Sequence, residues 1–466
     1  MAEERLARLD SSSRTRRKHR LGRPPLNPDL PTNPDVVIVG AGAAGIGSGL
    51  ALTRLGIPFV ILEAKRRVGG RAYSDTTSIG QLWDQGCHWF HAAENNPLRQ
   101  LADRLRHDRV ETDEGWVREV FRDGKRLTPP EQAKNAACID AALTAIGQSE
   151  TSPRDVSTAE AARLGGPDAA YARFVIEVIG GGLAEDMSAL DQARYDSGDS
   201  DLAVTGGYGA LIERLAAGLP IRLGCQITAL SSRPNGVDVQ TDQGTVRARA
   251  VILTVSTNVL RSGRILLEPV LPADVVTALG DVPLGSCEKI AAELVGQPSA
   301  WPSETKILAL HGGEVFSIHV RQYGRPVITA NLAGAGALRI GRASDAEGGA
   351  LLCDVLAGIY GSDVWRCLGR TKVTRWSLDP HVLGAYSYCK VGRADARRQL
   401  MDADLGPLLL AGEAYSQTWF STAHGAYLSG IEAAHKAAGR LGRKPRNMAP
   451  LWLPVDGPSG DGPSVG

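Results

Sequence analysis

Residues 36–63 read VVIVGAGAAGIGSGLALTRLGIPFVILE, and this stretch decides the fold class. A Val-rich run leads directly into a G-x-G-x-x-G motif made by Gly40, Gly42 and Gly45. In such a turn the first glycine permits a tight bend, the second lets the backbone approach a pyrophosphate, and the third lets the helix pack on the strand. The stretch therefore predicts one βαβ unit, with a strand at 35–39, a helix at 43–55 and a strand at 59–62.

The end of the second predicted strand strengthens this interpretation. Glu63 follows Gly42 by 21 residues, where a carboxylate can accept hydrogen bonds from ribose hydroxyls. The helix N-terminus, at Ala44, would turn its dipole toward the phosphates. The unit predicts a dinucleotide site, although the motif does not separate NAD from FAD.

Composition excludes several classes of protein. The 466 residues suffice for two domains. The 52 basic and 51 acidic side chains give a net charge of only +1, so no nucleic-acid partner is expected. Residues 36–52 carry no charge, but their five glycines favour a strand turning into a helix over a membrane span. The seven cysteines form no C-x-x-C pair and no zinc-type cluster. We expect a cytoplasmic protein without metal, and the oligomeric state stays open, with a homodimer as one option.

Two interleaved domains are expected between two tails. The tails are a basic, Pro-rich segment at 1–34 and a Pro/Gly-rich segment at 441–466. A doubly wound α/β domain that binds the dinucleotide is expected to comprise residues 35–95, 205–285 and 390–440. An α+β substrate domain is expected to comprise residues 96–204 and 286–389.

The residues after Glu63 identify the cofactor class by resemblance. The chain continues AKRRVGGRAYS (64–74) and so resembles the flavin-containing amine oxidase family, which includes monoamine and polyamine oxidases and flavin-dependent histone demethylases. The family's E-A-x-x-R-x-G-G-R stretch is matched by Glu63, Ala64, Arg67, Gly69, Gly70 and Arg71. The resemblance implies FAD, and two arginines near a pyrophosphate are also reasonable as bidentate anion donors.

The likeness continues over most of residues 35–440. The matching stretches are DQGCHWFHAAENNPL (84–98), LAVTGGYGALIERLA (202–216), ILTVSTNVLRSG (252–263), VTRWSLDPHVLGAYSY (373–388) and LLLAGEAYSQTWFSTAHGAYLSG (408–430). Two positions depart from the family pattern: Ala92 replaces a glycine and Ser256 replaces a proline. Several motifs in order are far more specific than any one of them.

The resemblance also implies the residues around the flavin. Lys289 is similar in placement to the family lysine that holds a water against flavin N5, and Tyr386 to one wall of an aromatic cage. Thr422 takes the second cage position and leaves the cage incomplete. His91 aligns with a histidine of several polyamine oxidases, and Trp376 would pack on the isoalloxazine. Four of these side chains also have an ordinary alternative, which is a solvated charge for Lys289 and a core residue for Tyr386, His91 and Trp376.

The remaining implied contacts hold the cofactor without a covalent bond. Gly412 and Glu413 would meet the ribityl and phosphate part of FAD, with Ile227 and Ala423 also against the cofactor. Ala385 stands where oxidases that tether their flavin have cysteine, so noncovalent FAD is expected. Five aspartates between 186 and 201 are interpreted as a solvated acidic loop.

These features imply FAD-dependent oxidation of an amine. Hydride would pass from the α-carbon to flavin N5, the imine would hydrolyse, and O₂ would be reduced to H₂O₂. The incomplete cage favours a long or bulky, polyamine-like amine. Three alternatives stay open: a flavin desaturase or dehydrogenase of a lipid or ring substrate, a flavoprotein binding module with secondary redox activity, and a plain NAD dehydrogenase, which would leave the G-G-R and A-G-E elements without a purpose.

Overall fold

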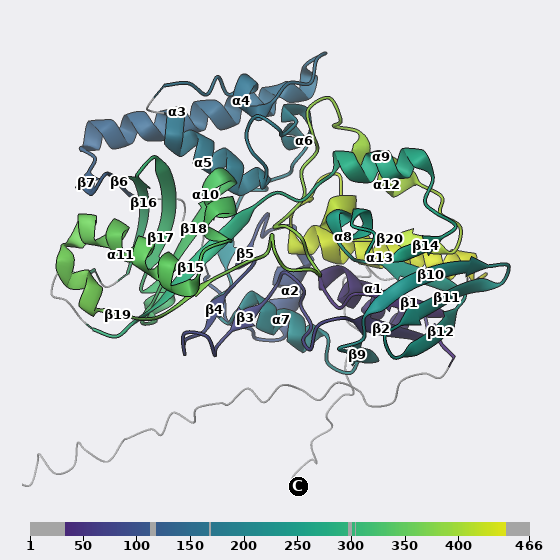
Figure 1. The fold of residues 1–466 in the computed structure, drawn as a ribbon. Coiled ribbons are helices and arrows are strands. Elements are labelled where there is room, and N and C mark those ends of the chain that lie inside the picture. Colours follow the sequence, from purple (N-terminus) through teal and green to yellow (C-terminus); the bar gives the residue numbers. More distant parts are fainter. Residues whose placement is uncertain (1–32, 112–117, 167–168, 297–300, 303, 444–466) are drawn as a thin grey trace, which may run out of the picture.

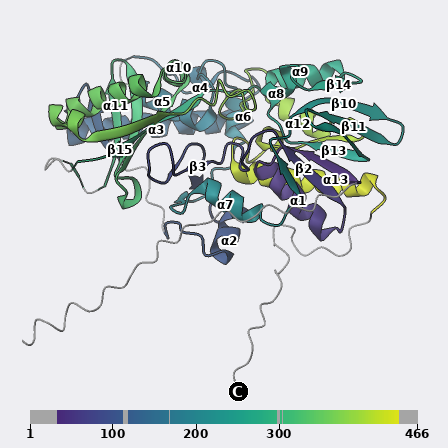
Figure 2. The same ribbon diagram turned by 60° about the horizontal axis from the view of Figure 1, so that its bottom comes forward.

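The computed structural model describes residues 33–111, 118–166, 169–296, 301–302 and 304–443. Two halves, each built around its own large sheet, lie side by side in the views of Figures 1 and 2. The tails expected at 1–34 and 441–466 lie almost wholly outside the described residues.

The dinucleotide half contains a parallel sheet in the order β20-β13-β1-β2-β9. Its strands are β1 (Val36–Val39), β2 (Phe59–Glu63), β9 (Ile221–Leu223), β13 (Ala250–Leu253) and β20 (Leu408–Leu410). Helices α1 (Ala43–Arg54) and α13 (Ala423–Arg440) come from opposite ends of the chain and pack against each other on this sheet.

Burial on both faces explains why the first strand is a continuous apolar run. Val36 and Ile38 join the core shared with α1 and α13. Val37 and Val39 point the other way, into a second core. Three antiparallel strands and one parallel strand help to cover that second face: β10 (Ile227–Arg233), β11 (Gly236–Thr241), β12 (Gly244–Ala248) and β14 (Leu266–Glu268).

The substrate half is organised around a seven-stranded sheet in the order β19-β15-β18-β17-β16-β6-β7. Its strands are β6 (Glu119–Arg122), β7 (Lys125–Arg126), β15 (Cys287–Leu294), β16 (Thr305–His311), β17 (Glu314–Val320), β18 (Val327–Ala333) and β19 (Leu368–Val373). Helices α10 (Gly334–Ile340) and α11 (Asp345–Tyr360) share one core with the sheet. Helices α3 (Pro129–Gly147) and α5 (Ala169–Gly180) share another with it, above the sheet in Figure 1.

Short elements complete the chain. They are β3 (Ser74–Asp75), β4 (Trp83–Asp84), β5 (Trp89–Phe90), α2 (Pro97–Arg104), α4 (Thr158–Ala161), α6 (Ala189–Ala193), β8 (Leu202–Ala203), α7 (Tyr208–Leu215), α8 (Thr257–Arg261), α9 (Ala273–Asp281) and α12 (Ala396–Asp402). Four 3₁₀ turns lie at η1 (Gln148–Thr151), η2 (Gln322–Gly324), η3 (Ser362–Arg366) and η4 (Glu413–Tyr415).

The expected α/β fold with an interleaved α+β half is confirmed, with two differences in detail. A four-stranded sheet covers the far face of the parallel sheet together with helices, which are α8, α9 and α12. Helix α2 also follows the boundary expected at residue 96, yet its Leu98 and Leu101 belong to the core of the dinucleotide half. No described helix is long and apolar enough to cross a bilayer, and no three described metal-type ligands gather in one place.

Candidate active site

One cavity of about 1150 Å³ runs from the glycine turn of the dinucleotide half to the sheet of the substrate half. It is larger than the roughly 300–1,000 Å³ typical of small-molecule sites, so a dinucleotide and a substrate can share it. All but two of the predicted site residues line it: Gly40, Gly42, Ala44, Glu63, Ala64, Gly70, Arg71, His91, Ile227, Lys289, Trp376, Tyr386, Gly412, Glu413, Thr422 and Ala423.

The glycine turn leaves room for a bound group against its backbone. A Cβ added at Gly42 would meet nothing nearer than the Cα of Gly70 at 4.0 Å. No side chain caps the N-terminus of α1, and no acidic residue lies in its first turn. An uncapped helix start with open space beside it fits a pyrophosphate.

Glu63 is held so that its carboxylate faces the same cavity. Its Oε2 accepts a hydrogen bond from the Ala41 N–H at 2.8 Å, and its Oε1 accepts one from the Lys65 N–H at 2.8 Å. Each carboxylate oxygen has a further lone pair for a ribose hydroxyl. The residues present therefore fit the adenosine part of a dinucleotide.

Gly45 and Arg67 do not line the cavity, and both support the turn from behind. A Cβ at Gly45 would lie 2.0 Å from the Gly40 carbonyl oxygen, so glycine is required where α1 crosses β1. The Arg67 guanidinium donates to the Gly70 carbonyl at 2.9 Å and stacks on Tyr73 at 3.9 Å. Arg67 thus braces residues 68–70, and its place beside a pyrophosphate stays a prediction.

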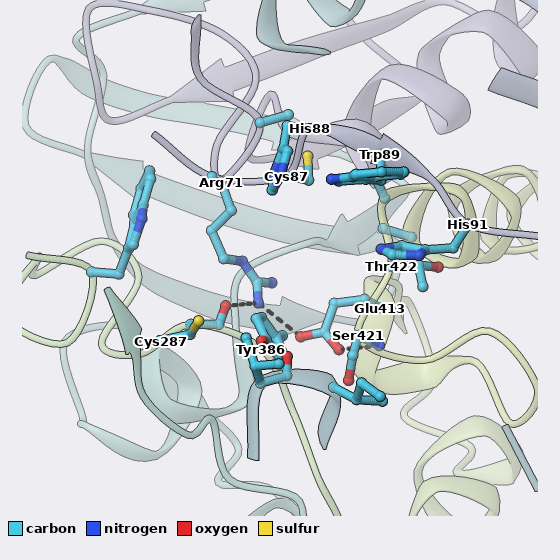
Figure 3. Close-up of a pocket in the computed structure, with 18 of the residues that line it drawn as sticks. Arg71, Cys87, His88, Trp89, His91, Cys287, Tyr386, Glu413, Ser421 and Thr422 are labelled. Atoms are coloured by element: carbon cyan, nitrogen blue, oxygen red, sulfur yellow. Dashed lines mark hydrogen bonds and ion pairs between the residues drawn. The ribbon is translucent and has the colours of Figure 1, made fainter. Parts of the chain in front are cut away.

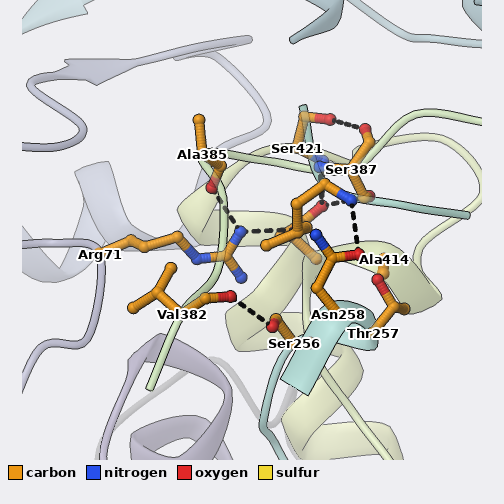
Figure 4. A network of polar contacts seen from close by, with 12 residues as sticks. Arg71, Ser256, Thr257, Asn258, Val382, Ala385, Ser387, Ala414 and Ser421 are labelled. Atoms are coloured by element: carbon orange, nitrogen blue, oxygen red, sulfur yellow. Dashed lines mark hydrogen bonds and ion pairs between the residues drawn. The ribbon is translucent and has the colours of Figure 1, made fainter. Parts of the chain in front are cut away.

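Arg71 joins distant parts of the chain beneath the cavity (Figure 4). Its Nη1 donates to the Ala385 carbonyl at 2.7 Å and to Glu413 Oε1 at 2.8 Å. The other oxygen, Oε2, accepts from the Ser387 hydroxyl at 2.6 Å and the Ser421 N–H at 2.9 Å. Burial raises the pKa of the Glu413 carboxyl, but the Arg71 charge and the Ser387 hydroxyl outweigh it and hold that pKa below its usual value. The Glu413 carboxylate is therefore bound on both oxygens by groups of the protein, and the residue also lines the cavity.

Lys289, on β15, is buried, and three acceptors surround its ammonium group. Nζ donates to the carbonyls of Gly86 at 2.6 Å and Asp84 at 3.0 Å, and to His88 Nδ1 at 3.1 Å. Burial lowers its pKa, against the opposing Asp84 carboxyl. A bound molecule that Lys289 is to hold must share or displace one of these three contacts.

His88 is a cavity residue that the sequence reasoning missed. Its Nδ1 accepts from Lys289, which requires the ring hydrogen on Nε2. Burial and the nearby Lys289 charge lower its pKa well below the usual value, so the ring is neutral. His88 stands at an unspecified position of the 84–98 motif, so nothing in the spacing marked it. Trp89, which is a specified tryptophan of that motif but was not named as a site residue, lines the cavity as well, and so does Cys287, which carried no signal.

Tyr386 and Trp376 lie on the wall where β15 meets the loop before β20. The Tyr386 hydroxyl donates to the Val178 carbonyl of α5, and burial raises the tyrosine pKa well above its usual value. The Trp376 indole donates to the Gln85 carbonyl at 3.1 Å. Both rings are thus held in place by a hydrogen bond at their polar end, as buried Tyr and Trp require.

Thr422 and His91 line the cavity in the region that also holds Trp89, as Figure 3 shows. Thr422 is the N-cap of α13: its hydroxyl accepts from the Gly425 N–H at 3.0 Å and donates to the Trp419 carbonyl at 2.7 Å. His91 Nδ1 lies 2.9 Å from Asp201 Oδ2. Thr422 is small, as expected, and Trp89 contributes an aromatic ring to this region.

The acidic stretch 186–201 is only in part the solvated loop that was expected, since Asp186 and Asp199 are exposed but two other aspartates are not free surface charges. Asp191 is fully buried and pairs with Arg397 at 3.0 Å. Asp201 lines the cavity beside His91. The long-range partners, Arg397 above all, could not be read from local composition.

Comparisons with known proteins agree with this geometry. The profile of the family described as flavin-containing amine oxidoreductase matches residues 43–438. Polyamine oxidase 4 of Oryza sativa subsp. japonica is 28% identical over 446 residues, covering 88% of this chain and 89% of the relative. Lysine-specific histone demethylase 2 of Homo sapiens is 26% identical, and the match covers 87% of this chain and 53% of the demethylase.

Solved structures show the same fold. Cyclohexylamine oxidase from Brevibacterium oxydans IH-35A matches with a TM-score of 0.73 at 19% identity, over 88% of this chain and 100% of that one. A putrescine oxidase variant redesigned in cofactor binding matches with a TM-score of 0.72 at 21% identity, over 87% of this chain and 99% of that one. The chain therefore belongs to the family of flavin-containing amine oxidoreductases and is an FAD-dependent enzyme acting on amines.

Proposed function

We propose that the chain oxidises a long or bulky amine with O₂ as the electron acceptor. The amine loses a hydride from its α-carbon and a proton from its nitrogen, the imine takes up water, and O₂ takes up two electrons and two protons. The products are a carbonyl compound, the released amine and H₂O₂. Bound FAD supplies the hydride acceptor. A single observation carries the proposal: one cavity joins the dinucleotide residues Gly42 and Glu63 to Lys289 and Tyr386.

The residues of the chain have distinct tasks in this scheme. The Tyr386 ring and its hydrogen bond to α5 form a rigid wall that orients the amine. Burial in a cavity of this kind lowers the pKa of a bound ammonium and so favours the neutral amine, whose lone pair the reaction requires. Lys289 places a cationic group at the cavity, which favours anionic charge developing there.

A panel of amines tests the proposal. The purified holoenzyme is expected to consume O₂ and to form H₂O₂ and carbonyl product in a 1:1:1 ratio with an amine whose nitrogen or α-carbon carries a long or bulky group. Benzylamine and phenylethylamine serve as compact comparators. Amine oxidation without peroxide would assign another electron acceptor, and the compact amines reacting best would contradict the proposed size preference.

A further inference from the structure

The floor of the cavity beyond Lys289 is one row of side chains across the substrate sheet. Strand register pairs Lys289 with Asn331, Asn331 with Ser317, Ser317 with Leu308, and Leu308 with Val120. Directly paired residues share a face, and all five line the cavity. Four strand spacings of about 4.8 Å carry the row about 19 Å from β15 to β6.

The chemistry of this row changes along its length. Lys289, Asn331 and Ser317 make the end near the dinucleotide site polar. Leu308 and Val120 make the far end apolar, and both are buried. We call the part of the cavity over β17, β16 and β6 the distal arm.

Two helices close the distal arm with apolar side chains. Helix α5 contributes Phe174 and Val175, which pack in one cluster with Leu308. Helix α3 contributes Ile139 and Leu143, four residues apart and thus on one helical face. Helix α3 also brings polar residues to the cavity, which are Gln132, Asn135 and Asp140. An occupant of the arm therefore meets the hydrocarbon of Phe174, Val175, Ile139 and Leu143 with these polar groups beside it.

The guanidinium of Arg118 opposes a second cation in an occupant of the arm. Arg118 lines the arm and donates its Nε hydrogen to the Ser317 hydroxyl at 3.3 Å. Burial lowers the pKa of its guanidinium to about 10, which leaves it charged at neutral pH. One carboxylate, that of Asp140 on α3, also lines the cavity, but it is exposed, so water screens its attraction for a cation. An ammonium in the arm would lose hydration among apolar groups and be repelled by Arg118.

We propose that the distal arm binds an extended hydrocarbon substituent, so that the substrate is a monoamine with a long apolar chain and not a polyamine. This inference rests on the proposed amine oxidation and narrows its substrate class. The arm length and the apolar lining of α3, α5 and β16 carry it.

A homologous series of N-methylalkylamines, from propyl to decyl, tests the inference on the holoenzyme. Each buried methylene is expected to raise kcat/KM about fourfold until the arm is full. Aza analogues, in which one distal methylene is replaced by a protonated NH, match each chain in length, and their kcat/KM is expected to be at least about tenfold lower. Analogues without an α-hydrogen cannot be oxidised. Their Kd values are therefore expected to rank the chains in the same order as kcat/KM, independently of turnover.

A charge placed in the arm gives the sharper test. Leu143 is 37% exposed, so Leu143→Glu adds a carboxylate without burying a charge in the core. We expect Leu143→Glu to raise the ratio of kcat/KM for the aza analogue to kcat/KM for the alkylamine by about tenfold. Leu338→Glu on α10 is the matched control, because Leu338 is 40% exposed and lies outside the cavity lining. It should leave the ratio unchanged.

The outcomes separate this inference from the proposed function. Equal kcat/KM along the alkyl series, a preference for the aza analogues by the wild type, or an unchanged ratio in Leu143→Glu would overturn the apolar arm while leaving amine oxidation in place. Failure of every amine to reduce the bound flavin would remove the proposed function itself.

Discussion

His88 controls one of the three contacts of the Lys289 ammonium, so substitutions of His88 test what that contact does. His88→Leu removes the acceptor, whereas His88→Asn can present a carbonyl oxygen near the place of Nδ1. Because a hydrogen bond to a charged group contributes about 1.5–3 kcal/mol, we expect His88→Leu to lower kcat by about tenfold or more with FAD still bound.

Two further variants, Lys289→Met and His88→Asn, show whether a loss of activity in His88→Leu comes from the lost contact with the Lys289 ammonium. Lys289→Met, which removes the whole ammonium, should slow flavin reduction, reoxidation or both by at least as much as His88→Leu. His88→Asn should recover most of the loss, because it restores an acceptor at similar volume. Separate measurement of anaerobic reduction and of reoxidation by O₂ shows the affected step. Wild-type rates in Lys289→Met would make Lys289 a structural residue.

Glu413 makes stability depend on pH in a defined direction. Its pKa in the folded protein lies below the ordinary value of 4.5, so its charged form contributes stability that is complete above about pH 4.5 and is lost as the pH falls below it. Glu413→Gln breaks a buried pair with Arg71 and is expected to cost about 3–5 kcal/mol at pH 7.

Urea unfolding of wild type and Glu413→Gln at pH 7 and pH 4 checks this expectation. The difference in unfolding free energy should be smaller at pH 4. The control, Glu293→Gln, breaks a surface pair with Arg370 and should cost about 1 kcal/mol or less. Equal costs for the two variants would mean that the Arg71 network does not stabilise the fold.

At the scale of elements, substitutions in the turn between β1 and α1 are expected to affect cofactor binding and folding separately. Gly42 has an ordinary φ of −78°, and a Cβ there projects into the cavity. Gly42→Ala is therefore expected to fold normally and to lose FAD, because the methyl group fills the space of the phosphate approach. Gly45→Ala should destabilise the protein by about 1–3 kcal/mol or more, since its Cβ would collide with the Gly40 carbonyl.

The flavin content and the melting temperature of the two variants provide the check. Gly439→Ala on α13, where an added Cβ meets nothing within 4 Å, is the neutral control. Full FAD binding by Gly42→Ala would show that the phosphates lie elsewhere.

Thr422 tests how the start of α13 shapes the pocket. Thr422→Tyr removes the N-cap and adds a ring to the cavity, while Thr422→Ala removes the cap alone, at about 1 kcal/mol. The tyrosine variant should shift preference toward small amines by about 10- to 200-fold in relative kcat/KM, and the alanine variant should not. The same ranking of amines in both variants would show that residue 422 does not border the bound amine.

The elements that carry a local signal could be predicted from the sequence. The expected units at 35–39, 43–55 and 59–62 are confirmed as β1, α1 and β2, because glycine spacing and apolar runs are local. The floor of the distal arm could not be predicted, since it depends on the register among β15, β18, β17 and β16. The register depends on which residues of two strands lie opposite each other, and no single position of the sequence indicates that.

At the scale of the whole molecule, the site is assembled from segments that only folding brings together. Arg71 meets Glu413 across 342 residues, and Asp191 meets Arg397 across 206. Motif resemblance placed Arg71 and Glu413 near the cofactor without indicating that they bind each other. It did not indicate that Arg67 binds the Gly70 carbonyl and braces the turn, because a motif gives the position of a residue and not the direction of its side chain.

Anaerobic reduction of the bound flavin tests the central claim most directly. The purified protein should be yellow and should release FAD on denaturation, because Ala385 offers no thiol for a covalent bond. Without O₂, a long-chain N-methylalkylamine should bleach the oxidised flavin with one equivalent of amine per flavin, and air should restore the colour with formation of H₂O₂. A flavin that dithionite bleaches and no amine does, or a protein that cannot be reconstituted with FAD, would contradict the account.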